Sequence, residues 1–219
     1  MLFRSTVFVY MAAENDLDYY STMDLQEMID GSKKLNDHQN LIVYVDKAEN
    51  YSDPHTYMIR LKDGQAIDTL RMEESLTSDP ETLSKTLSRA VKDYPAKSYG
   101  LVLWGHASGW LVKDASLVKA RNRAYGVDNG NNSPNSKGSN WMDIPPMAEA
   151  LTQALNGQKL KFILADCCNM GCVEVAYELR NLAEYYISSP AEIPDRGAPY
   201  DEIVPAMFST QETFYKDVV

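Results

Sequence analysis

Short apolar runs alternate along the chain with stretches in which apolar residues recur every three or four positions. Runs rich in β-branched and aromatic residues, typical of strands, lie at 2–11, 40–45, 99–104 and 160–165. The periodic stretches predict helices that begin near Asn15 or Asp16, at Pro80, near Pro145 and at Cys172. Strands and helices that alternate in this way predict a mainly parallel sheet between two helical layers, a three-layer α/β/α sandwich.

Several segments depart from this simple alternation. Alternating residues at 56–61 and 66–70, separated by Asp63 and Gly64, predict a β-hairpin at the edge of the sheet. Gly31 is expected to end the first helix. Residues 182–187 fit either the end of a helix or another strand, and 201–207 fit a short helix. Residues 111–140 lose periodicity and collect Asn, Ser, Gly and Lys, which predicts a loop longer than a simple connection needs.

Composition narrows the possible classes of protein. The 219 residues are 44% hydrophobic and 24% charged, which is typical of one globular domain covering residues 1–219. A net charge of −10 with scattered Lys and Arg argues against nucleic acid as a partner. No apolar run approaches the roughly 18 residues of a membrane span. The first ten residues resemble a strand and not a signal peptide.

The three cysteines, at 167, 168 and 172, are odd in number and crowded together, so they do not form a disulfide framework. Cys168 and Cys172 with a histidine would make a poor metal site, because no CxxC or HxxxH pair accompanies them, and no metal site is predicted. A thiol redox pair of Cys167 and Cys168 is a further alternative, which would appear as a reducible disulfide between neighbours. Cys167 is expected to lie in the core as a small apolar residue.

Two chemically reactive residues each come directly after a predicted buried strand. His106 follows the strand at 99–104, and Cys168 follows the strand at 160–165. Because parallel strands end at one edge of a sheet, both side chains can meet there, where a helix amino terminus and free backbone N–H groups favour a thiolate. From spacing alone, a catalytic Cys–His dyad and two ordinary structural residues are equally good interpretations.

The residues around both positions resemble the clostripain family of cysteine peptidases. The resemblance rests on Trp104-Gly-His-Ala-Ser-Gly-Trp110 and on the stretch from Asp166 to Arg180, and weaker blocks extend it over about residues 6–204. It implies a caspase-like fold and a cysteine endopeptidase that cleaves after Arg or Lys, with His106 and Cys168 as the dyad. Two positions depart from the family pattern: Ala107 replaces a typical glycine, and Cys167 replaces a typical alanine.

The resemblance also implies roles for the surrounding groups. The backbone N–H groups of Ala107 and Cys168 would hold the oxyanion. Asp166 would pair with the basic side chain of the substrate, because a buried cation requires a carboxylate; alternatively it only caps the turn that follows. Asp195 and Asp201 are fallback candidates for the same role.

The loop at 111–140 contains a basic segment and resembles a processing loop. Self-cleavage is expected between Lys119 and Ala120, with Arg121 and Arg123 as alternatives, whereas the simpler interpretation is a solvated loop. Some relatives depend on calcium; this sequence has no EF-hand-like loop, so no cofactor is predicted and calcium stays open.

The same resemblance bears on partners, localisation and an alternative function. The expected partners are peptides or proteins with basic residues. We expect an exported protein, extracellular or in the cell envelope, whose signal is not part of this sequence. The competing interpretation is a catalytically silent, peptide-binding envelope protein of the same fold.

Overall fold

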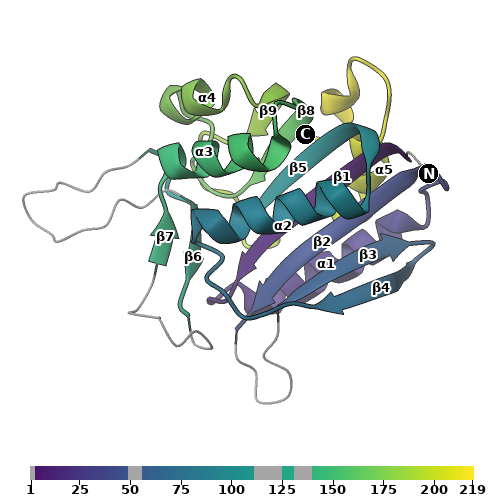
Figure 1. Ribbon diagram of the computed structural model, residues 1–219, viewed down its shortest axis with the longest axis horizontal. Coiled ribbons are helices and arrows are strands. Elements are labelled where there is room, and N and C mark those ends of the chain that lie inside the picture. The colour runs from purple at the N-terminus through teal and green to yellow at the C-terminus, as the bar shows by residue number, and fades with distance from the viewer. Residues whose placement is uncertain (1–2, 49–55, 111–124, 131–139) are drawn as a thin grey trace, which may run out of the picture.

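The computed structural model describes residues 3–48, 56–110, 125–130 and 140–219. Its main feature is a seven-stranded sheet of order β4-β3-β2-β1-β5-β8-β9 (Figure 1). The strands are β1 (Phe3–Ala13), β2 (Gln39–Lys47), β3 (Tyr57–Lys62), β4 (Gln65–Arg71), β5 (Ala96–Gly105), β8 (Leu160–Asp166) and β9 (Ala183–Ser188). Strands β1, β2, β5, β8 and β9 run parallel, and the antiparallel β3–β4 hairpin forms one edge. The mainly parallel α/β sheet predicted from the sequence is therefore confirmed.

Helices cover both faces of the sheet. One face carries α2 (Pro80–Asp93), α3 (Ile144–Leu155) and α4 (Val173–Leu179), which lie in front of the sheet in Figure 1. The other face carries α1 (Asp18–Ser32), α5 (Tyr200–Met207) and the short 3-10 helix η1 (Phe214–Asp217). Each layer buries its own cluster of apolar side chains against the central strands, which gives the three-layer sandwich its two cores.

Local sequence signals explain several boundaries. The carboxylate of Asp79 accepts a hydrogen bond of 2.9 Å from the Glu81 N–H and so caps α2, whose first residue is a proline. Asp63 and Gly64 both have positive φ, 52° and 75°, as a two-residue hairpin turn requires. Residues 182–187, which the sequence left open, belong mostly to strand β9.

Two segments differ from the sequence-based expectation. Helix α1 ends at Ser32, one residue beyond the predicted end at Gly31. Gly31 also serves the packing of α5, because a Cβ there would come within 2.7 Å of the Tyr200 carbonyl oxygen. Residues 125–128, within the expected long loop, form strand β6 (Tyr125–Asp128), which pairs antiparallel with β7 (Asn140–Met142). The expected processing site at Lys119 and Ala120 lies outside the described residues.

The strand order places a crevice at the carboxyl edge of the sheet. Strand β1 pairs with both β2 and β5. Helix α1, which follows β1, and helix α2, which precedes β5, lie on opposite faces of the sheet. Ligands of open α/β sheets bind where the connections diverge in this way. Within the described residues, no helix is both long and apolar enough to span a lipid bilayer.

Candidate active site

His106 and Cys168 lie at the same edge of the sheet, on neighbouring strands. Strands β5 and β8 are paired in register with Trp104 opposite Asp166, and each reactive residue comes two positions later. Both side chains line a shallow cavity of about 30 Å³. The other residues that line it are Leu17, Trp104, Gly105, Asp166, Cys167, Ile193, Pro194, Asp195 and Gly197. The structure thus brings together the thiol, the imidazole and the acid that the sequence singles out.

The imidazole of His106 is held by a carboxylate from the neighbouring strand end. Its Nε2 lies 2.6 Å from Oδ1 of Asp16, and its side chain is 31% exposed. The His106 carbonyl accepts a hydrogen bond of 2.8 Å from the Gly126 N–H, and Ala107 bridges to Tyr125. Strand β6 therefore fixes the backbone at His106, and Asp16 fixes its ring.

The thiol of Cys168 faces the loop that precedes α5. The Ile193 N–H lies 3.4 Å from Sγ, and the Ile193 carbonyl oxygen lies 3.8 Å from it. Helix α4 begins at Val173 with Cys172 as its N-cap, close to the predicted start, so Cys168 lies in the turn between β8 and this helix. The histidine loop packs tightly on this turn, because a Cβ at Gly109 (φ 63°) would come within 2.3 Å of the Asn169 carbonyl oxygen.

The structure separates the two adjacent cysteines. Cys167 is 1% exposed and belongs to the apolar core beneath α3 and α4, as expected. Burial raises the pKa of the Cys167 thiol well above its ordinary value, and the nearby Asp166 and Cys168 raise it further. Cys168 is partly exposed and lies in the cavity. Only Cys168 combines access to a ligand with proximity to His106.

Ala107 adopts a backbone conformation that any residue accepts. It is not among the described residues with positive φ, so an alanine there is unstrained although relatives typically have glycine. Among the described residues, the Ala107 N–H donates no hydrogen bond to a backbone carbonyl. Ala107 follows His106 in the chain but is not among the residues that line the cavity.

Asp166 forms part of the cavity wall and is 7% exposed. Its Oδ2 accepts hydrogen bonds from the Tyr200 hydroxyl at 2.7 Å and from the Ala198 N–H at 3.1 Å. Burial raises its pKa, and these two hydrogen bonds partly oppose the effect. The side chain thus joins β8 to the start of α5. Of the fallback candidates, Asp195 lines the cavity, whereas Asp201 lies in the first turn of α5 and does not.

A second buried carboxylate lies close behind the cavity. Asp24 of α1 is 1% exposed and accepts a hydrogen bond of 2.6 Å from the indole N–H of Trp104. Burial raises the pKa of Asp24 to about 7; the Trp104 hydrogen bond opposes this, and the charges of Asp166 and Glu27 add to it. Sequence reasoning missed Asp24 because its position on α1 fits an amphipathic helix equally well.

Asp16 was also missed as a site residue, because a carboxylate just before a helix is usually a cap. The structure shows no side-chain cap on α1. The signal that could have revealed Asp16 is its place directly beyond β1, which shares an edge with β5.

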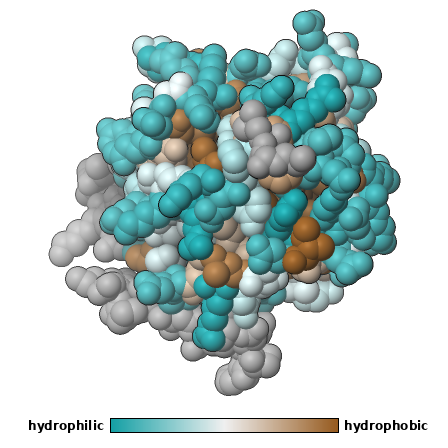
Figure 2. All heavy atoms as spheres, turned by 45° about the vertical axis from the view of Figure 1, so that its right-hand side comes forward, coloured by the Kyte–Doolittle hydropathy of each residue, from teal (hydrophilic) through white to brown (hydrophobic). Residues whose placement is uncertain are grey.

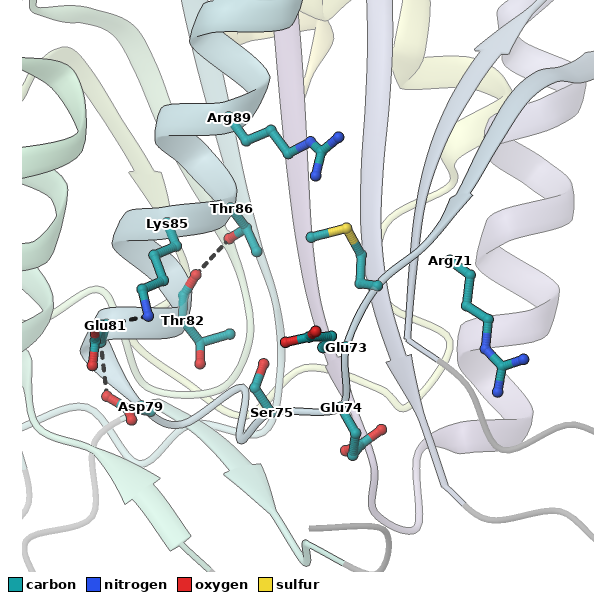
Figure 3. A pocket seen from close by; sticks show the side chains of 11 residues that line it. Arg71, Glu73, Glu74, Ser75, Asp79, Glu81, Thr82, Lys85, Thr86 and Arg89 are labelled. Carbon is teal, nitrogen blue, oxygen red and sulfur yellow. Dashed lines mark hydrogen bonds and ion pairs between the residues drawn. The ribbon is translucent and has the colours of Figure 1, made fainter.

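Other hollows and the general surface do not compete with this site. A larger cavity of about 460 Å³ lies between α2 and the segment after β4, lined by charges of both signs (Figure 3). It contains neither a thiol nor an imidazole. On the face shown in Figure 2, hydrophilic side chains predominate and hydrophobic ones appear as separate spots. The cavity with His106 and Cys168 is therefore the candidate active site because of its reactive groups, although its volume is the smaller of the two.

A thiol and an imidazole at the carboxyl edge of a three-layer α/β/α sandwich make a site of the cysteine-peptidase class. A sequence profile of the clostripain family matches residues 9–218, and the chain belongs to that family. Clostripain of Hathewaya histolytica is 27% identical in an alignment 225 positions long, which covers 91% of this chain and 41% of clostripain.

Two solved structures resemble the chain closely. A secreted C11 cysteine protease from Bacteroides thetaiotaomicron, in complex with an irreversible peptide inhibitor, has a TM-score of 0.80 and 37% identity. The alignment covers 99% of this chain and 58% of that protein. An inactive zymogen C11 protease from Parabacteroides distasonis has a TM-score of 0.74 and 32% identity, covering 100% and 56%. The chain thus spans about half the length of these relatives.

Proposed function

We propose that this chain carries the catalytic centre of an endopeptidase that cleaves peptide bonds after Arg or Lys. The observation that carries the proposal is the single cavity lined by His106, Cys168 and Asp166 at the ends of paired strands. A thiol, a base and a buried acid are the groups that acyl transfer from a basic residue requires.

In this proposal the Cys168 Sγ attacks the substrate carbonyl as a thiolate. His106 takes up the thiol proton and later delivers a proton to the leaving amine. The N–H groups of Ala107 and Cys168 stabilise the oxyanion of the tetrahedral intermediate. Water then releases the acyl group from Cys168. Before attack, the thiol must leave the Ile193 backbone and face the bound peptide.

Asp166 supplies the preference for a basic side chain. Its carboxylate is already oriented by Tyr200 and Ala198, so it needs little reorganisation when a guanidinium or ammonium group enters. A cation held next to an ionised carboxylate avoids the cost of being buried without a partner. Asp195, at the rim of the same cavity, adds a second negative charge there.

Self-cleavage between Lys119 and Ala120 follows from the same specificity, because this basic segment lies in the chain between His106 and Cys168. A Lys119→Ala chain should remain intact at that bond, and continued cleavage there would contradict the proposal. We further propose export from the cell, since the relative from Bacteroides thetaiotaomicron is described as secreted.

The deciding experiment is the intact mass of the protein before and after reaction with a peptidyl acyloxymethyl ketone that carries lysine at P1. We expect one thioether adduct per chain, which is lost in Cys168→Ala and retained in the matched control Cys167→Ala. A ketone with aspartate at P1 should label far more slowly. An unlabelled chain that still binds the peptide would favour the silent, peptide-binding alternative, and labelling that survives Cys168→Ala would refute the assigned nucleophile.

A further inference from the structure

Trp104 lines the active-site cavity, and its position is fixed from two sides. It is 2% exposed and lies in strand β5 beside Asp166 of β8. The Tyr125 hydroxyl lies 3.1 Å from the Trp104 carbonyl oxygen and holds the backbone. The indole N–H donates a hydrogen bond of 2.6 Å to Oδ2 of Asp24 in α1. Because an indole has only this one donor, the bond determines how the ring is turned.

Asp24 lies where helix α1 would ordinarily bury an apolar side chain. It belongs to the buried face of the helix, between Ser21 and Met28, and is 1% exposed. Burial raises its pKa to about 7, so its ionised form costs stability. Natural proteins keep such destabilising groups mostly at functional sites. The contact that Asp24 makes with the wall of the cavity is therefore a candidate for a functional role.

The charged neighbours of Asp24 come from its own helix, from β8 and from the loop before α5. Asp166 and Glu27 act on it with negative charge, and Arg196 acts on it with positive charge. Glu27 accepts a hydrogen bond from the Tyr200 N–H at 3.2 Å, and Asp166 accepts one from the Tyr200 hydroxyl at 2.7 Å. The start of α5 thus holds both of these acids, whereas Asp24 is directed to the indole.

The cavity has a strand side and a loop side. Trp104 and Asp166 lie on the paired strands β5 and β8, whereas Ile193 and Gly197 belong to the loop before α5. At about 30 Å³ the cavity has room for about one water, so it must widen before a long side chain enters. Loops move more easily than the strands of a sheet. The loop side therefore gives way, and the strand side sets the position of the entering side chain.

We propose that Trp104 is the apolar wall that receives the aliphatic stem of the P1 side chain, and that Asp24 is the residue that positions this wall. The inference rests on the proposed function and adds a second determinant of specificity to Asp166. Lysine and arginine pack their methylenes on apolar surface while the charged end reaches a partner. Because Trp104 and Asp166 are neighbours on paired strands, the indole can contact the stem while the carboxylate binds the charged end.

The positioning of the indole is tested without any need for activity, by NMR of the Cys168→Ala chain labelled with ¹⁵N. The chain has three tryptophans, so Trp110→Phe and Trp141→Phe assign the indole N–H signal of Trp104 by elimination. We expect this proton to lie downfield and to exchange slowly with solvent, as a bond to a buried carboxylate requires. Asp24→Ala should move the signal towards the position of a free indole. The other two indole signals should stay in place, which shows that the variant folds. An unchanged signal would overturn the positioning role.

Steady-state kinetics of the chain with its thiol intact tests the role of the wall. In Asp24→Ala, KM for a substrate with lysine at P1 should rise about tenfold because contact with the stem is lost, while kcat should change less than about threefold. Norleucine has the same stem without the charge, so kcat/KM for a norleucine substrate should fall by the same factor. Asp24→Asn keeps an oxygen that accepts from the indole and should restore KM to within about twofold of the parent value. Asp30→Ala is the matched control, since it removes a partly exposed acid of the same helix that pairs with Lys33.

The outcomes separate this inference from the proposed function. A parent chain that cleaves lysine substrates and is unaffected by Asp24→Ala overturns the inference and leaves the function in place. A loss for lysine alone, with norleucine unchanged and no rescue by Asp24→Asn, also overturns it, because Asp24 would then act through its charge. A parent chain that neither cleaves lysine substrates nor reacts with the lysine ketone refutes the proposed function, and the role of Trp104 as the P1 wall falls with it.

Discussion

The Nε2 of His106 lies 2.6 Å from the Oδ1 of Asp16, so the ends of two neighbouring parallel strands are joined by one side-chain contact. The Asp16 side chain is 85% exposed. An ion pair or hydrogen bond with such an exposed partner adds little to folding stability, at most about 1 kcal/mol. Its effect falls instead on the orientation of the imidazole ring towards Cys168.

Asp16→Ala should therefore reduce kcat about tenfold on a peptide substrate, because a ring that turns freely is seldom in the reactive orientation. The melting temperature should change by no more than a degree or two. Asp93→Ala is the matched control, since it removes another exposed aspartate that forms an ion pair, with Arg89. An unchanged kcat in Asp16→Ala would show that the contact has no role in catalysis.

Replacement of the buried acid should change substrate choice more than turnover in general. Asp166→Asn keeps the size of the side chain and its contacts with Tyr200 but removes the charge. Loss of one partner of a desolvated ion pair costs about 2–5 kcal/mol, so kcat/KM for lysine or arginine at P1 should fall at least about 30-fold. The same parameter for a neutral P1 residue should fall much less. Equal losses for both substrates would argue for a purely structural Asp166.

Acidic conditions should weaken the preference for basic residues. Because burial raises the pKa of Asp166, the carboxylate loses its charge at a higher pH than an ordinary aspartate does. As pH falls through that raised pKa, kcat/KM should fall for a lysine substrate relative to a norleucine substrate. Asp166→Asn should abolish this relative difference. A ratio of the two substrates that is independent of pH in the parent chain would contradict the prediction.

Asp24 should make the chain less stable as pH rises from about 4 to 7. Its pKa is about 7 in the folded chain against 3.8 as the ordinary value, so the folded state holds the proton more tightly. The stability that this proton provides is complete below pH 3.8 and is lost by the time the pH passes 7. Asp24→Asn should therefore raise the free energy of unfolding at pH 8 by about 2–4 kcal/mol.

Urea unfolding at pH 5 and pH 8 measures this directly, with the exposed Asp93→Asn as the control. A parent and an Asp24→Asn chain that lose stability in parallel between the two pH values would rule out Asp24 as the source.

Gly31→Ala should destabilise the chain although alanine is the better helix former. The gain in helix propensity is about 1 kcal/mol. The new Cβ would meet the Tyr200 carbonyl at 2.7 Å and the Val204 Cβ at 2.8 Å, and such overpacking costs about 1–3 kcal/mol. We expect a lower melting temperature, whereas Gln26→Ala on the exposed face of α1 should not lower it. A more stable Gly31→Ala chain would show that α5 moves away without cost.

The sequence was a good guide to the fold and to the main reactive residues. The buried strands are continuous runs of β-branched and aromatic residues, and parallel strands end at a common edge. That geometry is enough to predict that His106 and Cys168 share an edge. The hairpin at Asp63 and Gly64 was equally predictable, because only a few residue types accept positive φ.

What the sequence could not show are contacts that depend on how distant elements pack. Gly31 lies next to the end of α1, as its pattern predicts, but the sequence could not show that α5 packs closely against it. Strand β6 is short and contains a glycine, so periodicity did not reveal it.

The buried carboxylate of Asp166 and the Tyr200 hydroxyl that donates to it are separated by 34 residues along the chain. During synthesis on the ribosome, the chain reaches Cys168 well before it reaches Ala198 and Tyr200. At about 5–20 residues per second, the thiol and the histidine exist for some seconds without an oriented carboxylate beside them. If Asp166 selects the basic side chain as proposed, that selectivity is acquired only when Tyr200, at the start of α5, docks on the end of β8.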